Sequence, residues 1–218
     1  MGHLLLSWVQ PSAIFLNVGI DYAGPITLRF GGPRSKATQK AYLVVFVCMA
    51  TTAVHIEIVT SLSTKAFFDA FGRFTSRRGL PSIVYSDNAT KFQGAQRELS
   101  QLTQLLADPE FHGQVQDATS ASGVTWKFIP PRAPNFGGLW ETTIKSAKRH
   151  LRRVSSSQLY NFEELLTLTI AIEGILNSRP LGRLSDDPED LHYLSPGHFL
   201  IGRPMITLPL PNLELTPP

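Results

Sequence analysis

The first 60 residues follow the hydrophobic pattern of three consecutive β-strands. Apolar residues dominate segments 15–22 and 40–50, and segment 26–30 continues the first strand in extended form after a bend. Apolar and polar residues alternate over 54–59, which predicts a third, half-exposed strand. Glycine, proline, serine and lysine fill segment 31–39 and indicate a turn. We therefore expect an antiparallel meander at the start of the chain.

Helical periods and short apolar runs alternate in the rest of the chain. Phenylalanines recur at helical spacing between a Ser63–Thr64 cap and Gly79, so we expect a helix over 65–78 with an aromatic core face. Residues 110–122 are polar and poorly periodic, which predicts no regular element there. The segment from Leu181 is Pro-rich and predicted to be extended. The other expected elements are strands over 82–85 and 124–129 and helices over 90–106, 139–154 and 162–177.

This order of elements is three strands, helix, strand, helix, strand, helix, helix. It predicts an α/β fold with a mixed five-stranded sheet flanked by helices on both faces, which is the order of the ribonuclease H-like fold. We expect a core domain over 15–180. An N-terminal extension (1–14) would precede it, and a Pro-rich C-terminal arm or linker (181–218) would follow.

The composition is that of an ordinary globular chain, with 218 residues of which 43% are hydrophobic and 17% charged. The net charge of +3 permits a nucleic-acid partner without requiring one. The longest apolar run, 41–54, is shorter than a bilayer span, and residues 1–16 lack the basic start of a secretion signal. Cys48 is the single cysteine, so we expect a buried thiol, no disulfide and no structural zinc in this chain.

Three carboxylates stand where elements are expected to begin or end. Asp21 follows an apolar run, Asp87 follows a short strand, and Glu141 lies in the first turn of the helix over 139–154. A single Asp after a strand is more often a helix cap than a catalytic residue, so the group of three carries the argument. Carboxylates are the ligands that magnesium prefers, and two divalent ions roughly 4 Å apart support phosphodiester chemistry. The three residues are therefore a candidate metal site.

The helix expected over 139–154 has one packing face and one charged face, at about 100° per residue. Its charged face has two interpretations: a functional line of cations behind a carboxylate, or a solvated face with an i,i+4 pair between Glu141 and Lys145. The packing face comprises Ile144, Ala147, Leu151 and Val154, and the charged face comprises Glu141, Lys145, Lys148, Arg149 and Arg152.

Two smaller features also allow two interpretations each. His55 lies beside Glu57 in the alternating strand, where we expect a satisfied surface histidine in preference to a metal ligand. The loop over 130–138 is stiffened by prolines at its start and loosened by Gly137–Gly138 at its end. It is either a hinge that brings Glu141 into position or a plain surface connection.

Three motifs carry a family resemblance: VGIDYAGP at 18–25, SDNATKF at 86–92 and APNFGGLWE at 133–141. With them, nearly the whole chain resembles the catalytic core of retroviral-type integrases, in particular those of BEL/Pao long-terminal-repeat retrotransposons. The resemblance implies that Asp21, Asp87 and Glu141 are the catalytic, metal-binding triad and that two Mg²⁺ (or Mn²⁺) ions are the cofactors. It also implies that Lys145 and Lys148 contact donor DNA.

The activity implied by this resemblance is that of a polynucleotidyl transferase: metal-dependent DNA 3′-end processing and strand transfer, which is DNA integration. The expected partners are element ends and target DNA, bound along Lys145, Lys148, Arg149 and Arg152. We also expect a homo-oligomer that acts in the nucleus and has no membrane association.

The chain departs from the family pattern in three ways. Ala89 stands where many members have glycine, the spacing from Asp87 to Glu141 exceeds that of retroviral enzymes, and the chain lacks a His/His/Cys/Cys zinc module. We interpret the chain as a polyprotein fragment or a decayed copy. A catalytically inactive or domesticated nucleic-acid-binding fragment, or a structural oligomerisation core, are the alternative functions.

Overall fold

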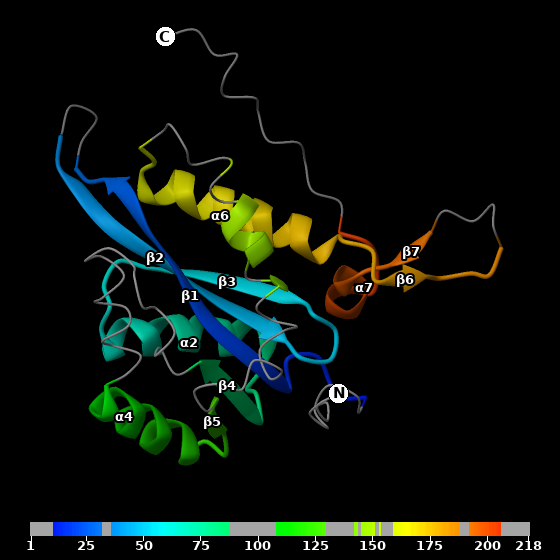
Figure 1. Cartoon of the computed structure of the whole chain (residues 1–218), viewed down its shortest axis with the longest axis horizontal. Helices are drawn as coiled ribbons and strands as arrows, with labels where there is room; N and C mark the ends of the chain where they lie inside the picture. Colours follow the sequence, from blue (N-terminus) through cyan, green and yellow to red (C-terminus); the bar gives the residue numbers. More distant parts are fainter. Residues whose placement is uncertain are drawn as a thin grey trace, which may run out of the picture.

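The computed structural model describes most of the chain as an α/β domain around one sheet (Figure 1). The described residues are 11–31, 36–87, 108–129, 142–143, 145–150, 153, 159–187 and 192–205. The elements are, in order, β1 (Asn17–Arg29), β2 (Thr38–Cys48), β3 (Val54–Val59), α2 (Thr64–Arg78), β4 (Ile83–Asp87), α4 (Pro109–Ser120), β5 (Thr125–Ile129), α6 (Phe162–Asn177), β6 (Gly182–Arg183), β7 (Tyr193–Leu194) and α7 (Pro196–Ile201).

The main sheet has five strands in the order β3-β2-β1-β4-β5. The first three form an antiparallel meander, whereas β4 pairs parallel to β1 and β5 parallel to β4. Helices α2 and α4 lie on one face of the sheet and α6 lies on the other (Figure 1). This is the mixed five-stranded sheet with helices on both faces that the order of elements predicted.

Strand β1 includes both extended segments that the sequence predicted, 15–22 and 26–30, apart from a residue or two at its ends. It runs from Asn17 to Arg29 and shifts register against β2 between Ala23 and Ile26. The bend expected between the two segments is therefore an irregularity within one strand. A Cβ at Gly24 would lie 3.1 Å from the Ala41 carbonyl oxygen, so glycine allows the two strands to approach closely here.

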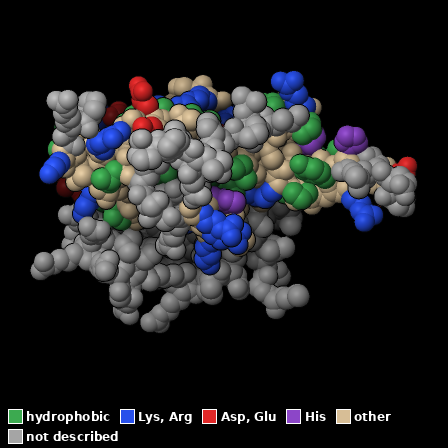
Figure 2. Space-filling model, turned by 90° about the horizontal axis from the view of Figure 1, so that it is seen from above, with side chains coloured by type: hydrophobic (Ala, Val, Ile, Leu, Met, Phe, Trp, Pro, Cys, Tyr) green, Lys and Arg blue, Asp and Glu red, His purple; other side chains and the backbone are tan. Residues whose placement is uncertain are grey.

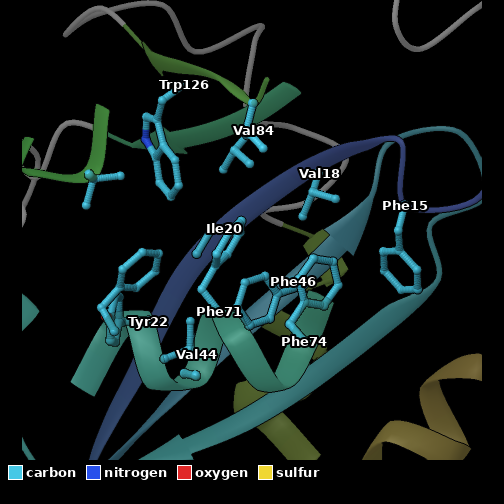
Figure 3. Close-up of a cluster of buried hydrophobic side chains, with 14 of the residues drawn as sticks. Phe15, Val18, Ile20, Tyr22, Val44, Phe46, Phe71, Phe74, Val84 and Trp126 are labelled. Carbon is cyan, nitrogen blue, oxygen red and sulfur yellow. The ribbon is translucent and has the colours of Figure 1, made fainter. Parts of the chain in front are cut away.

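Aromatic side chains fill the core on the α2 side of the sheet (Figure 3). The rings of Phe46 and Phe74 stack with centroids 4.2 Å apart, and Phe15 meets Phe74 edge-on at 5.4 Å. All three are fully buried, and burial of each such side chain stabilises the fold by about 1.5–3 kcal/mol. The aromatic face expected for the helix over 65–78 therefore packs as core, on the strands of the meander.

The opposite face of the sheet packs against α6 and against the helical residues near Ala147. Leu165 and Ile172 of α6 are buried there, and Ala147 is also buried. Helix α6 begins at a capping box, because Asn161 accepts from the Glu164 N–H and Glu164 accepts from the Asn161 N–H. None of the helices in the described part of the chain has the length and apolar character that spanning a bilayer requires.

Two expectations about irregular segments were wrong. Residues 110–122 were expected to lack a regular element, but α4 occupies most of them. Asp108 caps α4 by accepting from the Glu110 N–H at 2.9 Å, and Pro109 opens its first turn. The segment from Leu181 was expected to be extended, but it forms the short β6–β7 hairpin and α7.

Side chains of α6 close the free edge of β3, the outermost strand of the sheet. The Asn177 amide accepts from the Val54 N–H at 2.8 Å and donates to the Val54 carbonyl at 2.8 Å. Glu173 accepts from the Ile56 N–H at 2.9 Å. An edge strand otherwise presents unpaired backbone groups to other chains, so these contacts both anchor α6 and protect the edge.

An ionic group with a buried centre, which we call the edge cluster, joins β3 to the helices on both faces. The sequence predicted that β3 is half-exposed with a surface histidine, and this was wrong, because all six residues of β3 are buried. His55 Nε2 lies 2.9 Å from Glu57 Oε1, and His55 Nδ1 lies 3.4 Å from Glu173 Oε2. The edge cluster comprises His55, Glu57, Arg73, Arg77, Arg78 and Glu173.

Arginines of α2 make burial of these carboxylates possible. Arg73 and Arg77 both pair with Glu57, while Arg78 Nη2 lies 2.6 Å from Glu173 Oε1. Burial lowers the pKa of His55, but hydrogen bonds to Glu173 and Glu57 outweigh it and hold that pKa above its ordinary value. Burial raises the pKa of both glutamates, and their hydrogen bonds outweigh it, so both pKa values are lowered.

Replacing Asn177 by Ala should destabilise the fold, because it leaves the Val54 N–H and C=O without their side-chain partner. We expect the free energy of unfolding to fall by about 2–6 kcal/mol, at ~1–3 kcal/mol for each of the two buried groups left unsatisfied. Urea denaturation measures this change. Asn161→Ala, which removes an exposed helix cap, is the control and should cost about 1 kcal/mol. Equal losses in the two variants would contradict the edge-closing role of Asn177.

Histidine 55 should stabilise the fold most at acidic to neutral pH. Its pKa is raised in the folded state, so its contribution is fully present below the ordinary histidine pKa of about 6.5 and is lost as pH rises through the folded value. The difference in unfolding free energy between wild type and His55→Gln should therefore shrink from pH 6 to pH 9. A difference that stays constant over this range, measured by urea denaturation, would rule out a protonated His55.

Candidate active site

The parallel pairing of β1 with β4 brings two of the predicted site residues together. Paired positions run from Asn17 opposite Ile83 to Ile20 opposite Ser86. Asp21 and Asp87 are the next residues on their strands, and parallel strands set residues of equal register side by side. Strand β4 ends at Asp87, so the backbones of the two aspartates meet where this pairing stops.

The Asp21 carboxylate is partly buried and has identified partners on both oxygens. Its Oδ1 accepts from the Tyr22 N–H at 2.7 Å, and its Oδ2 lies 3.4 Å from the Nζ of Lys148. The two side chains of this ion pair are 22% and 27% exposed, respectively. Neighbouring Ile20 and Tyr22 pack into the aromatic core on the α2 side, so Asp21 lies toward the helical layer on the other face.

The helical residues 142–143, 145–150 and 153 carry the predicted cations. Lys145 and Arg149 are exposed, whereas Ala147 is buried in the core, as the packing face requires. Lys148 is half-buried and directed at Asp21, so it does not share the exposure of Lys145 and Arg149. Seen from above, Lys and Arg side chains lie at several separate places on this side of the molecule, with hydrophobic side chains between them (Figure 2).

An arginine that the sequence analysis did not single out holds the start of this helix. Arg179, just after α6, donates to the Thr52 carbonyl at 2.8 Å and lies 3.4 Å from the Thr143 hydroxyl oxygen. It therefore ties the β2–β3 turn to the helical segment, with Thr143 itself buried. The hydrophobic periodicity of the sequence could not reveal this role of Arg179, because Thr52 and Thr143 are distant from it in sequence.

Several predicted features lie outside the described residues. These are Glu141, Arg152, Ala89, the loop over 130–138, the helix over 90–106 and the side chain of Asp87. Among the described side chains, no group of three or more His, Cys, Asp or Glu is arranged to hold a metal ion. The site that the structure describes thus consists of Asp21, Lys148 and the backbone of Asp87.

The donor chemistry of this site fits a hard divalent cation. The donor that is described is a carboxylate, Asp21, which is partly open to solvent and already has a cationic group at its Oδ2. The residue set beside it by strand pairing is a second aspartate. Oxygen ligands without a thiolate favour magnesium or manganese over zinc, and the one cysteine, Cys48, is buried elsewhere in the core.

Comparisons with solved structures identify the fold. The chain superposes with a TM-score of 0.58 and 14% identity on a chain of the simian T-cell lymphotropic virus intasome in complex with PP2A regulatory subunit B56 gamma, covering 96% of this chain and 61% of that one. It also matches the HTLV-2 integrase catalytic core domain in complex with magnesium (dimeric form) at a TM-score of 0.49 and 16% identity, covering 80% and 93%.

No protein-family model matches the chain, and no curated protein matches it. The chain spans about 61% of the length of the intasome chain that it resembles. Together, the strand order, the helices on both faces and the likeness to the intasome chain show the ribonuclease H-like fold that the sequence predicted.

Proposed function

We propose that this chain is the catalytic core of a retrotransposon integrase that performs metal-dependent DNA 3′-end processing and strand transfer. The observation that carries the proposal is the register of β1 against β4, which sets Asp21 and Asp87 side by side within an integrase-type fold. The motifs at 18–25, 86–92 and 133–141 support an assignment to the BEL/Pao group.

The catalytic residues in this proposal are Asp21, Asp87 and Glu141, whose carboxylates would hold two Mg²⁺ or Mn²⁺ ions. When bound, such ions activate the attacking oxygen and stabilise the leaving oxygen of a phosphodiester. The attacking group is water in 3′-end processing and a DNA 3′-hydroxyl in strand transfer. The protein contributes position: the strand pairing sets the backbones of Asp21 and Asp87 beside each other before any substrate binds.

The DNA-binding residues in this proposal are the cations of the helix after Glu141. Lys145 and Arg149 expose their side chains and offer charge to phosphates. Lys148 and Arg152 complete the set expected from the sequence. We assign the partners as element ends and target DNA, the assembly as a homo-oligomer and the site of action as the nucleus, since the target is host DNA.

Strand-transfer or disintegration assays with Mg²⁺ or Mn²⁺ test the reaction. Asp21→Asn and Asp87→Asn should each lower the rate by at least about 100-fold, because losing a direct metal ligand costs more than the 10–100-fold typical of residues that support ligands. Asp69→Asn, an exposed residue of α2, is the matched control and should keep wild-type activity. A wild-type chain that binds DNA but is inactive with both metals would favour the non-catalytic, nucleic-acid-binding alternative.

Salt dependence of DNA affinity tests the basic helix face. Lys145→Ala and Arg149→Ala should each reduce the slope of log K against log salt by about one unit, since each lost phosphate contact releases one counterion fewer. Fluorescence anisotropy with duplex DNA measures the slope. Lys65→Ala, whose side chain is 84% exposed on α2, should leave it unchanged. Unchanged slopes in all three variants would indicate the solvated-face interpretation.

A further inference from the structure

We propose that Lys148 is an exchangeable counter-ion of Asp21: it neutralises this carboxylate when no divalent ion is bound, and it moves to a DNA phosphate when an ion binds. The inference rests on the proposed function and adds a regulatory step to the same site. It assigns Lys148 two successive partners, Asp21 and then a DNA phosphate.

The first observation is the geometry of the ion pair. Lys148 Nζ lies 3.4 Å from Asp21 Oδ2, and both side chains are largely shielded, at 27% and 22% exposure. A pair with this burial is screened less by water and salt than an exposed pair. Lysine at this position therefore offsets part of the negative charge of a largely shielded carboxylate.

The second observation concerns which carboxylate oxygen is used. Asp21 Oδ1 accepts a short hydrogen bond from the Tyr22 N–H at 2.7 Å, so Oδ2 is the oxygen better placed to bind a cation. Lys148 contacts Oδ2. Magnesium binds oxygen at about 2.0–2.1 Å and keeps a shell of further ligands, so an ion on Oδ2 would repel an ammonium group held in the same space. The lysine and the metal ion therefore compete.

The third observation is that buried residues on the same helix anchor the backbone that carries Lys148. Ala147 is buried in the core, and Thr143 is buried beside Arg179. The four-carbon stem of lysine allows its ammonium group to move without the helix. Release from Asp21 thus turns Lys148 toward the solvent-facing side of the helix, where Lys145 and Arg149 are exposed.

Competition at Asp21 couples metal binding to DNA binding. An ion that displaces Lys148 adds one cation to the DNA-binding face, and DNA that holds Lys148 removes the competitor of the ion. Because linkage is reciprocal, each ligand raises the affinity for the other by the same factor. The proposed site would thereby favour a state in which metal and DNA are both present.

The test measures Mn²⁺ binding by calorimetry without DNA, using the full chain. Lys148→Met keeps the apolar stem and removes the charge, so it should bind Mn²⁺ about five-fold or more tightly than wild type. Lys148→Gln is a second variant that should behave alike, and Lys65→Met, at a side chain 84% exposed on α2, is the control that should keep wild-type affinity. Wild-type or weaker Mn²⁺ affinity in both Lys148 variants overturns the exchange.

A second measurement compares DNA affinity with and without Mn²⁺. The ion should strengthen DNA binding more in wild type than in Lys148→Met, because only wild type gains a released lysine. Equal enhancement in the two proteins overturns the exchange even if the metal affinities differ.

Failure of the exchange is distinguishable from failure of the proposed function through Asp21→Asn. If wild type binds Mn²⁺ and Asp21→Asn does not, the metal site stands and the Lys148 variants judge the exchange alone. If wild type binds no Mn²⁺ with or without DNA, the metal site and the exchange both fail.

Discussion

The parallel pairing of β1 with β4 is the constraint on which the candidate site depends. Four consecutive pairs, from Asn17–Ile83 to Ile20–Ser86, leave Asp21 and Asp87 as the next residues on each strand. A slip of one residue would move one aspartate to the opposite face of its strand. Buried residues of both strands fix this register. Val18 of β1 and Val84 of β4, for example, pack into the aromatic core on the α2 side of the sheet (Figure 3). Core packing thus determines the position of the chemistry.

Electrostatics is organised differently at the β3 edge of the sheet and at the inner β1–β4 junction. At the β3 edge, each buried carboxylate has arginine or histidine partners, and backbone N–H groups satisfy part of Glu173. At the β1–β4 junction, Asp21 has a lysine at 3.4 Å and keeps some exposure to solvent. The first arrangement is closed and structural, since planar guanidinium groups bind carboxylates with fixed geometry. The second is suited to ligand exchange, because a lysine holds a carboxylate less rigidly.

Local sequence signals predicted the elements whose causes are local. The bounds of β3 and α6 agree with the predicted 54–59 and 162–177, because the apolar period of each element is readable from neighbouring residues. Helix α4 was missed because residues 110–122 are polar and poorly periodic, although Asp108–Pro109 before them is a good N-cap and first-turn combination. The burial of His55 and Glu57 was not readable, since the arginines that neutralise Glu57 are 16 and 20 positions later in the chain, at 73 and 77. The inward turn of Lys148 was missed for a similar reason: helical periodicity assigns a face to a residue but not the direction of a long side chain.

The contact between Arg78 and Glu173 has a consequence for how this sequence can change over time. Arg78 belongs to α2 below the sheet and Glu173 to α6 above it, and they meet around the edge of β3 at 2.6 Å. Loss of either charge leaves the other without its ion-pair partner in a largely buried environment. A substitution at one position alone is therefore destabilising. In related chains, substitutions at positions 78 and 173 should therefore occur together. The ion pair thus makes two helices coevolve, although they lie in different layers and the two residues are 95 positions apart.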